Sequence, residues 1–309
     1  MAILFISQSF DGEEWRRFVT PLLPDVDFRV WPDVGPTEEV EMVVAWNVPP
    51  GAFEGLPNLK AIFWLGAGVE QLLRDPALPW RVPIIRLVDP SLTRQMTAYV
   101  LLGVLRHHRL AAAYEAQQRA ARWAALPRPD PADCRVGIMG LGVLGTDAAR
   151  KLLSLGFEVS GWSRTPKRLE GVKTHHGRER LKPFLGECDV VVCLLPLTPE
   201  TRDILNAEAF AAMKKGAYLV NAARGEHVVE EDLLEALESG QISGATLDVF
   251  RTEPLPPDHP YWRHPRVTVT PHAAADTLAH AVAPQVVENY RRMKRGEALP
   301  NLVDLDRGY

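Results

Sequence analysis

The fold is decided by the stretch Arg135-Val136-Gly137-Ile138-Met139-Gly140-Leu141-Gly142-Val143-Leu144-Gly145. Its first five residues form an apolar run typical of a strand, the next six follow the pattern G-x-G-x-x-G, and a helical segment comes directly after them. In that setting the first glycine permits a tight turn, the second lets the backbone approach a phosphate, and the third lets helix and strand pack closely. Because the N-terminus of the helix also offers N–H groups to an anion, the stretch predicts a dinucleotide-binding loop. An ordinary glycine-rich turn is the alternative.

Short apolar runs recur on both sides of this loop. After it, we expect strands at residues 157–161, 190–194, 217–221, 244–249 and 267–269, separated by segments of helix length. Together with the strand before the loop, these six predict a doubly wound parallel sheet. Before the loop, a smaller parallel α/β domain is expected from the runs at 2–7, 27–31, 41–46, 60–64 and 83–88. Helical periodicity follows at 91–110 and returns at 276–295.

The composition limits the classes of function. The chain has 309 residues, 46% of them hydrophobic, and a formal net charge of −4, so it offers no basic field for nucleic acid or an anionic membrane. Its cysteines, Cys134, Cys188 and Cys193, show no metal-type spacing and are expected to be buried thiols in a cytoplasmic protein. The apolar N-terminus is too short for a signal peptide or a membrane span. We expect small molecules and a second copy of the chain as partners, and no metal.

The residues after the second strand of the doubly wound sheet indicate which dinucleotide binds. A site specific for NAD usually carries an acidic residue there, which accepts hydrogen bonds from the ribose. This chain has Ser163, Arg164 and Thr165 instead, a guanidinium and two hydroxyls that suit a 2′-phosphate. Lys167 and Arg168 add positive charge. The pattern favours NADP(H), with NAD(H) used more weakly, and a solvated basic loop is the alternative.

Further strand-end segments are distinctive when taken together with the glycine loop. They are Asn221-Ala222-Ala223-Arg224-Gly225, Leu247-Asp248-Val249-Phe250 with Glu253-Pro254-Leu255, and Val269-Thr270-Pro271-His272. In order and spacing they resemble the D-isomer-specific 2-hydroxyacid dehydrogenase family over the whole chain. The resemblance implies two Rossmann-like domains with the active site in the cleft between them. The substrate-binding, flavodoxin-like domain would comprise 1–98 plus 276–309, and the NAD(P)-binding domain 99–275, with a dimerisation arm near 99–126.

The chemistry of such a site can be argued from Arg224, Glu253 and His272. Reducing a 2-keto acid requires a cation for the carboxylate, a polarised carbonyl and a proton for its oxygen. Arg224 offers a planar fork for carboxylate and carbonyl oxygens, and His272 is the expected proton donor. Glu253, if it is hydrogen-bonded to the other imidazole nitrogen, would favour the protonated ring and fix its orientation. Taken singly, an arginine after a strand is more often part of a surface ion pair.

A narrower resemblance is carried by Leu65-Gly66-Ala67-Gly68-Val69, Gln95-Met96 with Tyr99, Trp162-Ser163-Arg164-Thr165 and the terminal Arg307-Gly308-Tyr309. These look like the glyoxylate/hydroxypyruvate reductases within the family, which implies NADPH-preferring reduction of glyoxylate and hydroxypyruvate, an R (D) product and a homodimer. The cofactor residues would be Gly140, Gly142, Leu144, Gly145, Ser163, Arg164, Thr165, Leu195, Pro196, Ala222 and Asp248. The substrate residues would be Trp46, Gly66, Ala67, Gly68 and Arg224.

Two positions qualify this expectation. Asn47 stands where the resemblance leads us to expect histidine after Trp46, which bears on the polarity of the substrate pocket. Trp123, on the predicted arm, is hypothesised to approach the active site of the partner.

Two other functions remain open at this stage. One is an NAD-dependent D-2-hydroxyacid dehydrogenase with another substrate, which the missing acidic residue after Trp162 disfavours. The other is a non-catalytic protein that senses NAD(P)H through the same residues, against which we weigh the lack of a basic face.

Overall fold

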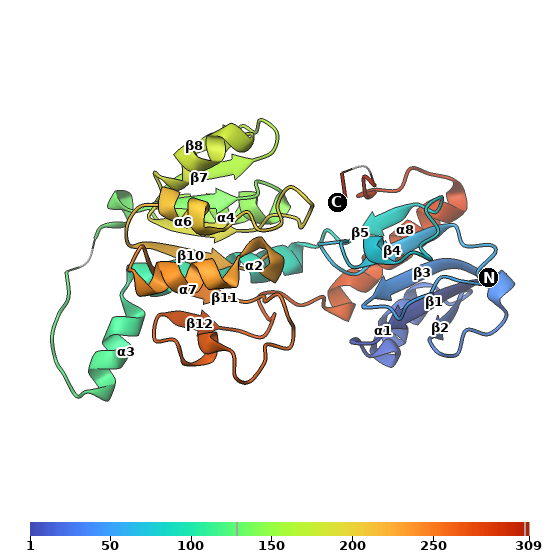
Figure 1. Ribbon diagram of the computed structural model, residues 1–309. Helices are drawn as coiled ribbons and strands as arrows, with labels where there is room; N and C mark the ends of the chain where they lie inside the picture. The colour runs from blue at the N-terminus through green and yellow to red at the C-terminus, as the bar shows by residue number, and fades with distance from the viewer. Residues whose placement is uncertain (128, 306, 309) are drawn as a thin grey trace. The chain divides into compact units, whose positions relative to one another are not determined.

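The protein consists of two compact units (Figure 1). The computed structural model describes residues 1–127, 129–305 and 307–308. Unit 1 comprises Met1–Leu92 with Thr277–Tyr309, and unit 2 comprises Thr93–Asp276. Unit 1 is therefore discontinuous in sequence, with segments from both ends of the chain. Tyr309, which belongs to the narrower resemblance, lies outside the described residues.

Unit 1 is built on a five-stranded parallel sheet in the order β2-β1-β3-β4-β5. Its strands are β1 (Ala2–Ser7), β2 (Asp27–Val30), β3 (Val40–Trp46), β4 (Ala61–Trp64) and β5 (Ile84–Arg86). The central strands are buried on both faces, which is why they read as continuous apolar runs. Helices α1 (Gly12–Val19) and α8 (Ala279–Arg295) pack against each other. Asp11 caps α1 by accepting the N–H of Glu13 at 2.9 Å.

Unit 2 contains a seven-stranded parallel sheet in the order β12-β11-β10-β9-β6-β7-β8. Its strands are β6 (Arg135–Met139), β7 (Glu158–Ser163), β8 (Val172–His176), β9 (Val190–Cys193), β10 (Ala217–Asn221), β11 (Ile242–Leu247) and β12 (Val267–Val269). Its helices are α3 (Ala111–Arg119), α4 (Val143–Ser154), α5 (Leu181–Leu185), α6 (Ala207–Ala212), α7 (Glu230–Glu238) and most of α2 (Pro90–His108). The chain winds outward from β6 to one edge and then to the other, so the strand order reverses between β6 and β9.

Two expectations about this architecture were wrong in detail. The sheet has seven strands after the first domain, not six, because Val172–His176 forms β8. No strand was expected at residues 172–176, because an edge strand with few apolar residues shows little hydrophobic periodicity. The last helix begins at Ala279 rather than 276, because both backbone groups of Asp276 are held by the Gln95 side chain at 3.0 and 3.1 Å.

The segment after α2 stands away from the sheet of unit 2 (Figure 1). None of the described residues of α3 is buried, and Trp123 beyond it is 102% exposed. The segment is tied to the body by a bidentate Arg106–Glu115 pair at 2.7 Å and folds back on itself where the Leu126 N–H donates to the Tyr114 hydroxyl at 3.1 Å. Nothing in this segment supplies a core of its own.

Other features bear on the class of protein. All three cysteines are free and buried, as expected. Among the described residues, no helix is both long and apolar enough to cross a membrane. The same residues contain no cluster of His, Cys, Asp and Glu that could hold a metal ion.

Glu187 ties the β7–β8 edge of the larger sheet together. Its carboxylate accepts hydrogen bonds from Ser160 Oγ at 2.7 Å and His175 Nε2 at 2.8 Å, and it also pairs with Lys173. Burial acts to raise the pKa of Glu187, but these partners outweigh it and lower the pKa to about 2.

This pKa predicts a pH-dependent contribution to stability. The pKa of Glu187 is lower in the folded chain than its ordinary value of 4.5, so the contribution is complete above that value and disappears as pH falls toward 2. We expect Glu187→Gln to lower the free energy of unfolding by about 1 to 3 kcal/mol at neutral pH. The difference from the wild type should shrink below about pH 5. Urea unfolding across this range measures it, with Glu179→Gln at an exposed position as the control. A difference independent of pH would contradict the assignment.

Candidate active site

The glycine loop has the geometry that its sequence predicts. Gly140 has a φ of +103°, and a Cβ at this position would lie 2.7 Å from Leu194 O. A Cβ on Gly145 would lie 1.9 Å from Gly140 O, so helix α4 and strand β6 approach too closely for a side chain. Gly142 is the N-cap residue of α4 and provides no side-chain cap, and the space around its Cα is open. The N–H groups of the first turn, including that of Leu144, therefore point toward a place where a phosphate can lie.

The basic segment after β7 lies near the loop that follows β9. Ser163 is buried, and its hydroxyl donates to Thr165 O at 2.8 Å. Arg164 and Thr165 are exposed. A hydrogen bond from Thr198 and, more weakly, the charge of Arg164 lower the pKa of Glu200. Arg164 therefore lies within electrostatic reach of the segment after β9, where Leu195 and Pro196 were predicted to contact the cofactor.

The buried side chain of His227 links that segment to Arg224. Its Nδ1 lies 3.2 Å from the Arg224 nitrogen, and its Nε2 lies 3.3 Å from Pro196 O. Burial lowers the pKa of His227, so the ring is neutral near pH 7. With the proton on Nε2, Nδ1 accepts from the Arg224 N–H and Nε2 donates to Pro196 O; with the proton on Nδ1, that nitrogen donates to Arg224 O, 3.0 Å away. Sequence reasoning missed His227, although a histidine three residues after Arg224 was the available signal.

Arg224 follows β10, and local packing fixes its backbone. Asn221 Nδ2 donates to Arg224 O at 3.0 Å, and Asn221 Oδ1 accepts the Ala223 N–H at 3.2 Å. A Cβ on Gly225 would lie 1.9 Å from the carbonyl carbon of Phe250, so only glycine fits where the chain leaves β10 beside the end of β11. The Arg224 guanidinium donates to Ala223 O at 2.6 Å. Ala222, a predicted cofactor contact, is buried at the same strand end.

Glu253 and His272 form a hydrogen-bonded pair. Glu253 Oε2 lies 2.8 Å from His272 Nδ1, and Glu253 Oε1 accepts the Phe250 N–H at 2.9 Å. Burial acts to raise the pKa of Glu253, but the hydrogen bonds from His272 and Phe250 and the charges of His272 and Arg224 lower it overall. The Glu253 carboxylate is thus hydrogen-bonded to one ring nitrogen of His272. The other nitrogen, Nε2, forms no hydrogen bond with a described residue. The structure therefore brings the three predicted catalytic residues together.

A buried carboxylate positions the segment that carries His272. Asp248 accepts hydrogen bonds from Thr270 Oγ1 at 2.5 Å and from the N–H groups of Ala273 and Ala274 at 2.9 and 3.0 Å. Tyr99 in turn donates to Thr270 at 2.6 Å. Burial outweighs that hydrogen bond and raises the pKa of Tyr99 to about 12, so its hydroxyl keeps the proton. His272 has a φ of +53°, a conformation that this network holds in place.

The predicted substrate residues of unit 1 gather at the ends of β3 and β4. A Cβ on Gly66 would lie 1.9 Å from the Trp46 ring, which therefore lies directly against the loop that contains Gly66, Ala67 and Gly68. Trp64 Nε1 donates to Gly68 O at 2.8 Å, and the rings of Trp46 and Trp64 are 5.1 Å apart. Ala67 and Gly68 are partly exposed, so the backbone of this loop is accessible to a ligand. These residues belong to unit 1, whereas Arg224, Glu253 and His272 belong to unit 2.

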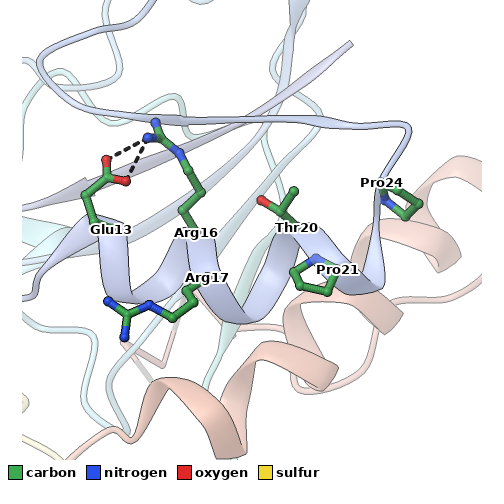
Figure 2. A pocket seen from close by; sticks show the side chains of 6 residues that line it. All are labelled: Glu13, Arg16, Arg17, Thr20, Pro21 and Pro24. Atoms are coloured by element: carbon green, nitrogen blue, oxygen red, sulfur yellow. Dashed lines mark hydrogen bonds and ion pairs between the residues drawn. The ribbon is translucent and has the colours of Figure 1, made fainter.

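A surface depression of about 520 Å³ lies elsewhere in unit 1, along α1 (Figure 2). It is lined by Glu13, Arg16, Arg17, Thr20, Pro21 and Pro24. Figure 2 shows Arg16 turned toward Glu13, to which it is paired at 2.7 and 2.8 Å. The depression contains none of the predicted site residues and is not part of the candidate active site.

Comparisons with known proteins agree with this geometry. The sequence model described as "D-isomer specific 2-hydroxyacid dehydrogenase, NAD binding domain" matches residues 101–274. The chain is 42% identical to glyoxylate/hydroxypyruvate reductase A of Serratia proteamaculans, with both proteins covered completely. It superposes at a TM-score of 0.96 and 45% identity on a D-isomer specific 2-hydroxyacid dehydrogenase from Xanthobacter autotrophicus in complex with NADPH and MES, covering 100% of this chain and 99% of the other. For the NADPH-dependent glyoxylate/hydroxypyruvate reductase of Sinorhizobium meliloti in complex with NADP and sulfate, the TM-score is 0.94 at 40% identity, with both chains covered completely. The chain therefore belongs to the D-isomer-specific 2-hydroxyacid dehydrogenase family.

Proposed function

We propose that the protein is an NADPH-dependent reductase of small 2-keto acids, which converts glyoxylate to glycolate and hydroxypyruvate to D-glycerate. The observation that carries the proposal is the Glu253–His272 pair, 2.8 Å apart, within reach of the charge of Arg224 and in the same unit as the glycine loop. The full-length identity of 42% to a glyoxylate/hydroxypyruvate reductase A supports the choice of substrate.

The residues of the nucleotide loop fit NADP(H). The uncapped N-terminus of α4 and the open space at Gly142 suit the pyrophosphate. Arg164 and Thr165 suit the 2′-phosphate, whereas the Ser163 proton is used within the loop and its oxygen can only accept. We assign Leu195, Pro196, Ala222 and Asp248 to the rest of the cofactor site, with Asp248 acting also on the segment of His272. When bound, the cofactor supplies the hydride.

The side chains of this chain do the remaining chemistry. The Arg224 guanidinium binds the carboxylate and the carbonyl oxygen of the keto acid, which lowers the energy of the developing alkoxide. His272 donates its Nε2 proton to that oxygen, and Glu253 stabilises the charged imidazole before transfer. The backbone N–H groups of Gly66, Ala67 and Gly68 bind the same carboxylate, and Trp46 packs against the substrate. Transfer of hydride to one face of the carbonyl gives the R (D) product that the family resemblance implies.

The exposed arm supports a homodimer. Residues of α3 are not buried, and the fully exposed Trp123 presents a large apolar ring that a second copy of the chain would cover. The corresponding hypothesis is that Trp123 approaches the active site of the second copy. The three buried free thiols suit a reducing compartment, and we propose a cytoplasmic location.

The direct test is oxidation of NADPH and NADH, followed at 340 nm, with glyoxylate, hydroxypyruvate, pyruvate and phenylpyruvate. We expect turnover of glyoxylate and hydroxypyruvate with NADPH to exceed every other combination, because the basic loop favours the 2′-phosphate. Tight NADPH binding without turnover of any keto acid would contradict the proposal and indicate a sensor of NADPH. Preferred use of NADH would instead indicate an NAD-dependent dehydrogenase.

The assigned proton donor gives a second prediction. We expect His272→Ala to lower kcat by about 10²- to 10⁴-fold, because no other described side chain bonded to Glu253 can deliver a proton. NADPH affinity, measured by fluorescence titration, should change little. His176→Ala, at an exposed position of β8, is the matched control. An unchanged kcat in His272→Ala would remove this residue from the mechanism.

The preference for NADPH over NADH gives a third prediction. Loss of a charge-assisted pair with the 2′-phosphate should make Arg164→Ala raise the KM for NADPH by about 10- to 100-fold and leave that for NADH nearly unchanged. The exposed Arg178→Ala serves as a control for the loss of one positive charge in the same unit. Equal losses with both cofactors would refute the role of Arg164.

A further inference from the structure

Arg86, the last residue of β5, has a partly buried side chain for which the described part of the chain supplies no partner. No hydrogen bond or ion pair to its guanidinium is formed by residues 1–127, 129–305 or 307–308, whereas its backbone N–H donates to Asn301 O at 3.1 Å. Burial by itself lowers the pKa of Arg86, without a neighbouring charge to oppose it. A guanidinium has five donors, so this side chain is short of acceptors.

Two other arginines with shielded side chains have acceptors for the N–H groups of their guanidinium. The Arg29 side chain is 10% exposed, pairs with Asp27 and Glu39, and donates to two backbone carbonyl oxygens. Arg106 is partly buried and forms a bidentate pair with Glu115 at 2.7 Å. An unpaired charge shielded from water is destabilising, and internal acceptors normally compensate it. Arg86 departs from that rule.

The nearest acidic residue in sequence does not neutralise it. Asp89 is buried, and its Oδ2 accepts the N–H groups of Ser91 and Leu92 at 2.7 and 2.9 Å, which caps α2. Its Oδ1 accepts from Gln285 at 3.0 Å. The Asp89 carboxylate is therefore committed to holding the start of α2 and to α8. An oxygen for Arg86 has to come from outside the described residues.

The position of Arg86 indicates which oxygen this is. Arg86 pairs with Trp64 in the register of β4 and β5, and the Leu87 N–H donates to Trp64 O at 3.0 Å. Residues paired in neighbouring parallel strands have side chains on the same face of the sheet. Arg86 therefore shares a face and a strand end with Trp64, whose indole nitrogen holds Gly68 O at 2.8 Å. The unpaired guanidinium thus belongs to the edge that carries the Gly66–Gly68 loop.

We propose that Arg86 is a specificity-determining residue, which binds the oxygen on C3 of the keto acid. The inference rests on the proposed function, in which Arg224 and the loop N–H groups bind the carboxylate and His272 serves the carbonyl oxygen. In hydroxypyruvate the only remaining oxygen is the C3 hydroxyl, and glyoxylate has no C3. Arg86 therefore acquires an acceptor with the larger substrate and none with the smaller one.

The test compares the two substrates in Arg86→Met, which keeps much of the length of the side chain and removes its charge. We expect kcat/KM for hydroxypyruvate to fall about 10- to 100-fold, mainly through KM, while the value for glyoxylate changes less than about threefold. Arg86→Lys should restore part of the loss. Arg81→Met, at an exposed position shortly before β5, is the matched control. The melting temperature of Arg86→Met should not fall, because the variant loses an uncompensated charge.

Each other outcome overturns the inference. Equal losses with glyoxylate and hydroxypyruvate would mean that Arg86 acts on the shared carboxylate or on the fold, and no loss would mean that it contacts no substrate. If the wild-type protein reduces neither keto acid, the proposed function fails separately. The thermal shift induced by D-glycerate against glycolate, with NADP⁺ present, then decides: it should be larger for D-glycerate in the wild type and equal for the two acids in Arg86→Met. Without that difference, the inference is wrong.

Discussion

Parallel strands of one sheet end at a common edge, and the candidate site depends on that constraint. In unit 2 the glycine loop follows β6, the basic segment follows β7, and Leu195 and Pro196 follow β9. Arg224, Asp248 and His272 follow β10, β11 and β12 in the same way. Residues separated by more than 130 positions in sequence therefore lie along one edge without long loops to bring them there.

Buried polar groups convert this shared edge into fixed geometry. Asp248 satisfies Thr270, Ala273 and Ala274, and His227 bridges the Arg224 backbone to Pro196. Each group is costly to bury, and each has its hydrogen bonds within the structure. The free energy of these bonds is lost if the loops move, so they hold Arg224 and His272 in position before a ligand arrives. The electrostatic preorganisation of the site therefore comes from residues that need not touch substrate.

The sequence was sufficient for the elements whose local signal is strong. The five strands of unit 1, the glycine loop and the helix after it have apolar runs or glycine spacings that few other structures produce, and all are present. Strand β8 was missed because its sequence, Val172-Lys173-Thr174-His175-His176, is mostly polar and its neighbours, not its own pattern, make it a strand. The start of α8 was misplaced because Gln95, 181 positions away, holds the backbone of Asp276.

By itself, the sequence determined the fold class and the glycine loop, and it singled out Arg224, Glu253 and His272 as candidate catalytic residues, because residue type and order at strand ends are local information. Only the tertiary structure decided that Glu253 is hydrogen-bonded to Nδ1 of His272 and that His227 contacts the backbone of Arg224. It also decided that the Ser163 hydroxyl donates its proton to Thr165 O within the same loop. It alone distinguished Arg86, since the absence of an acceptor is a property of everything packed around a side chain. Hydrogen-bond partners distant in sequence follow from packing, and no local pattern encodes them.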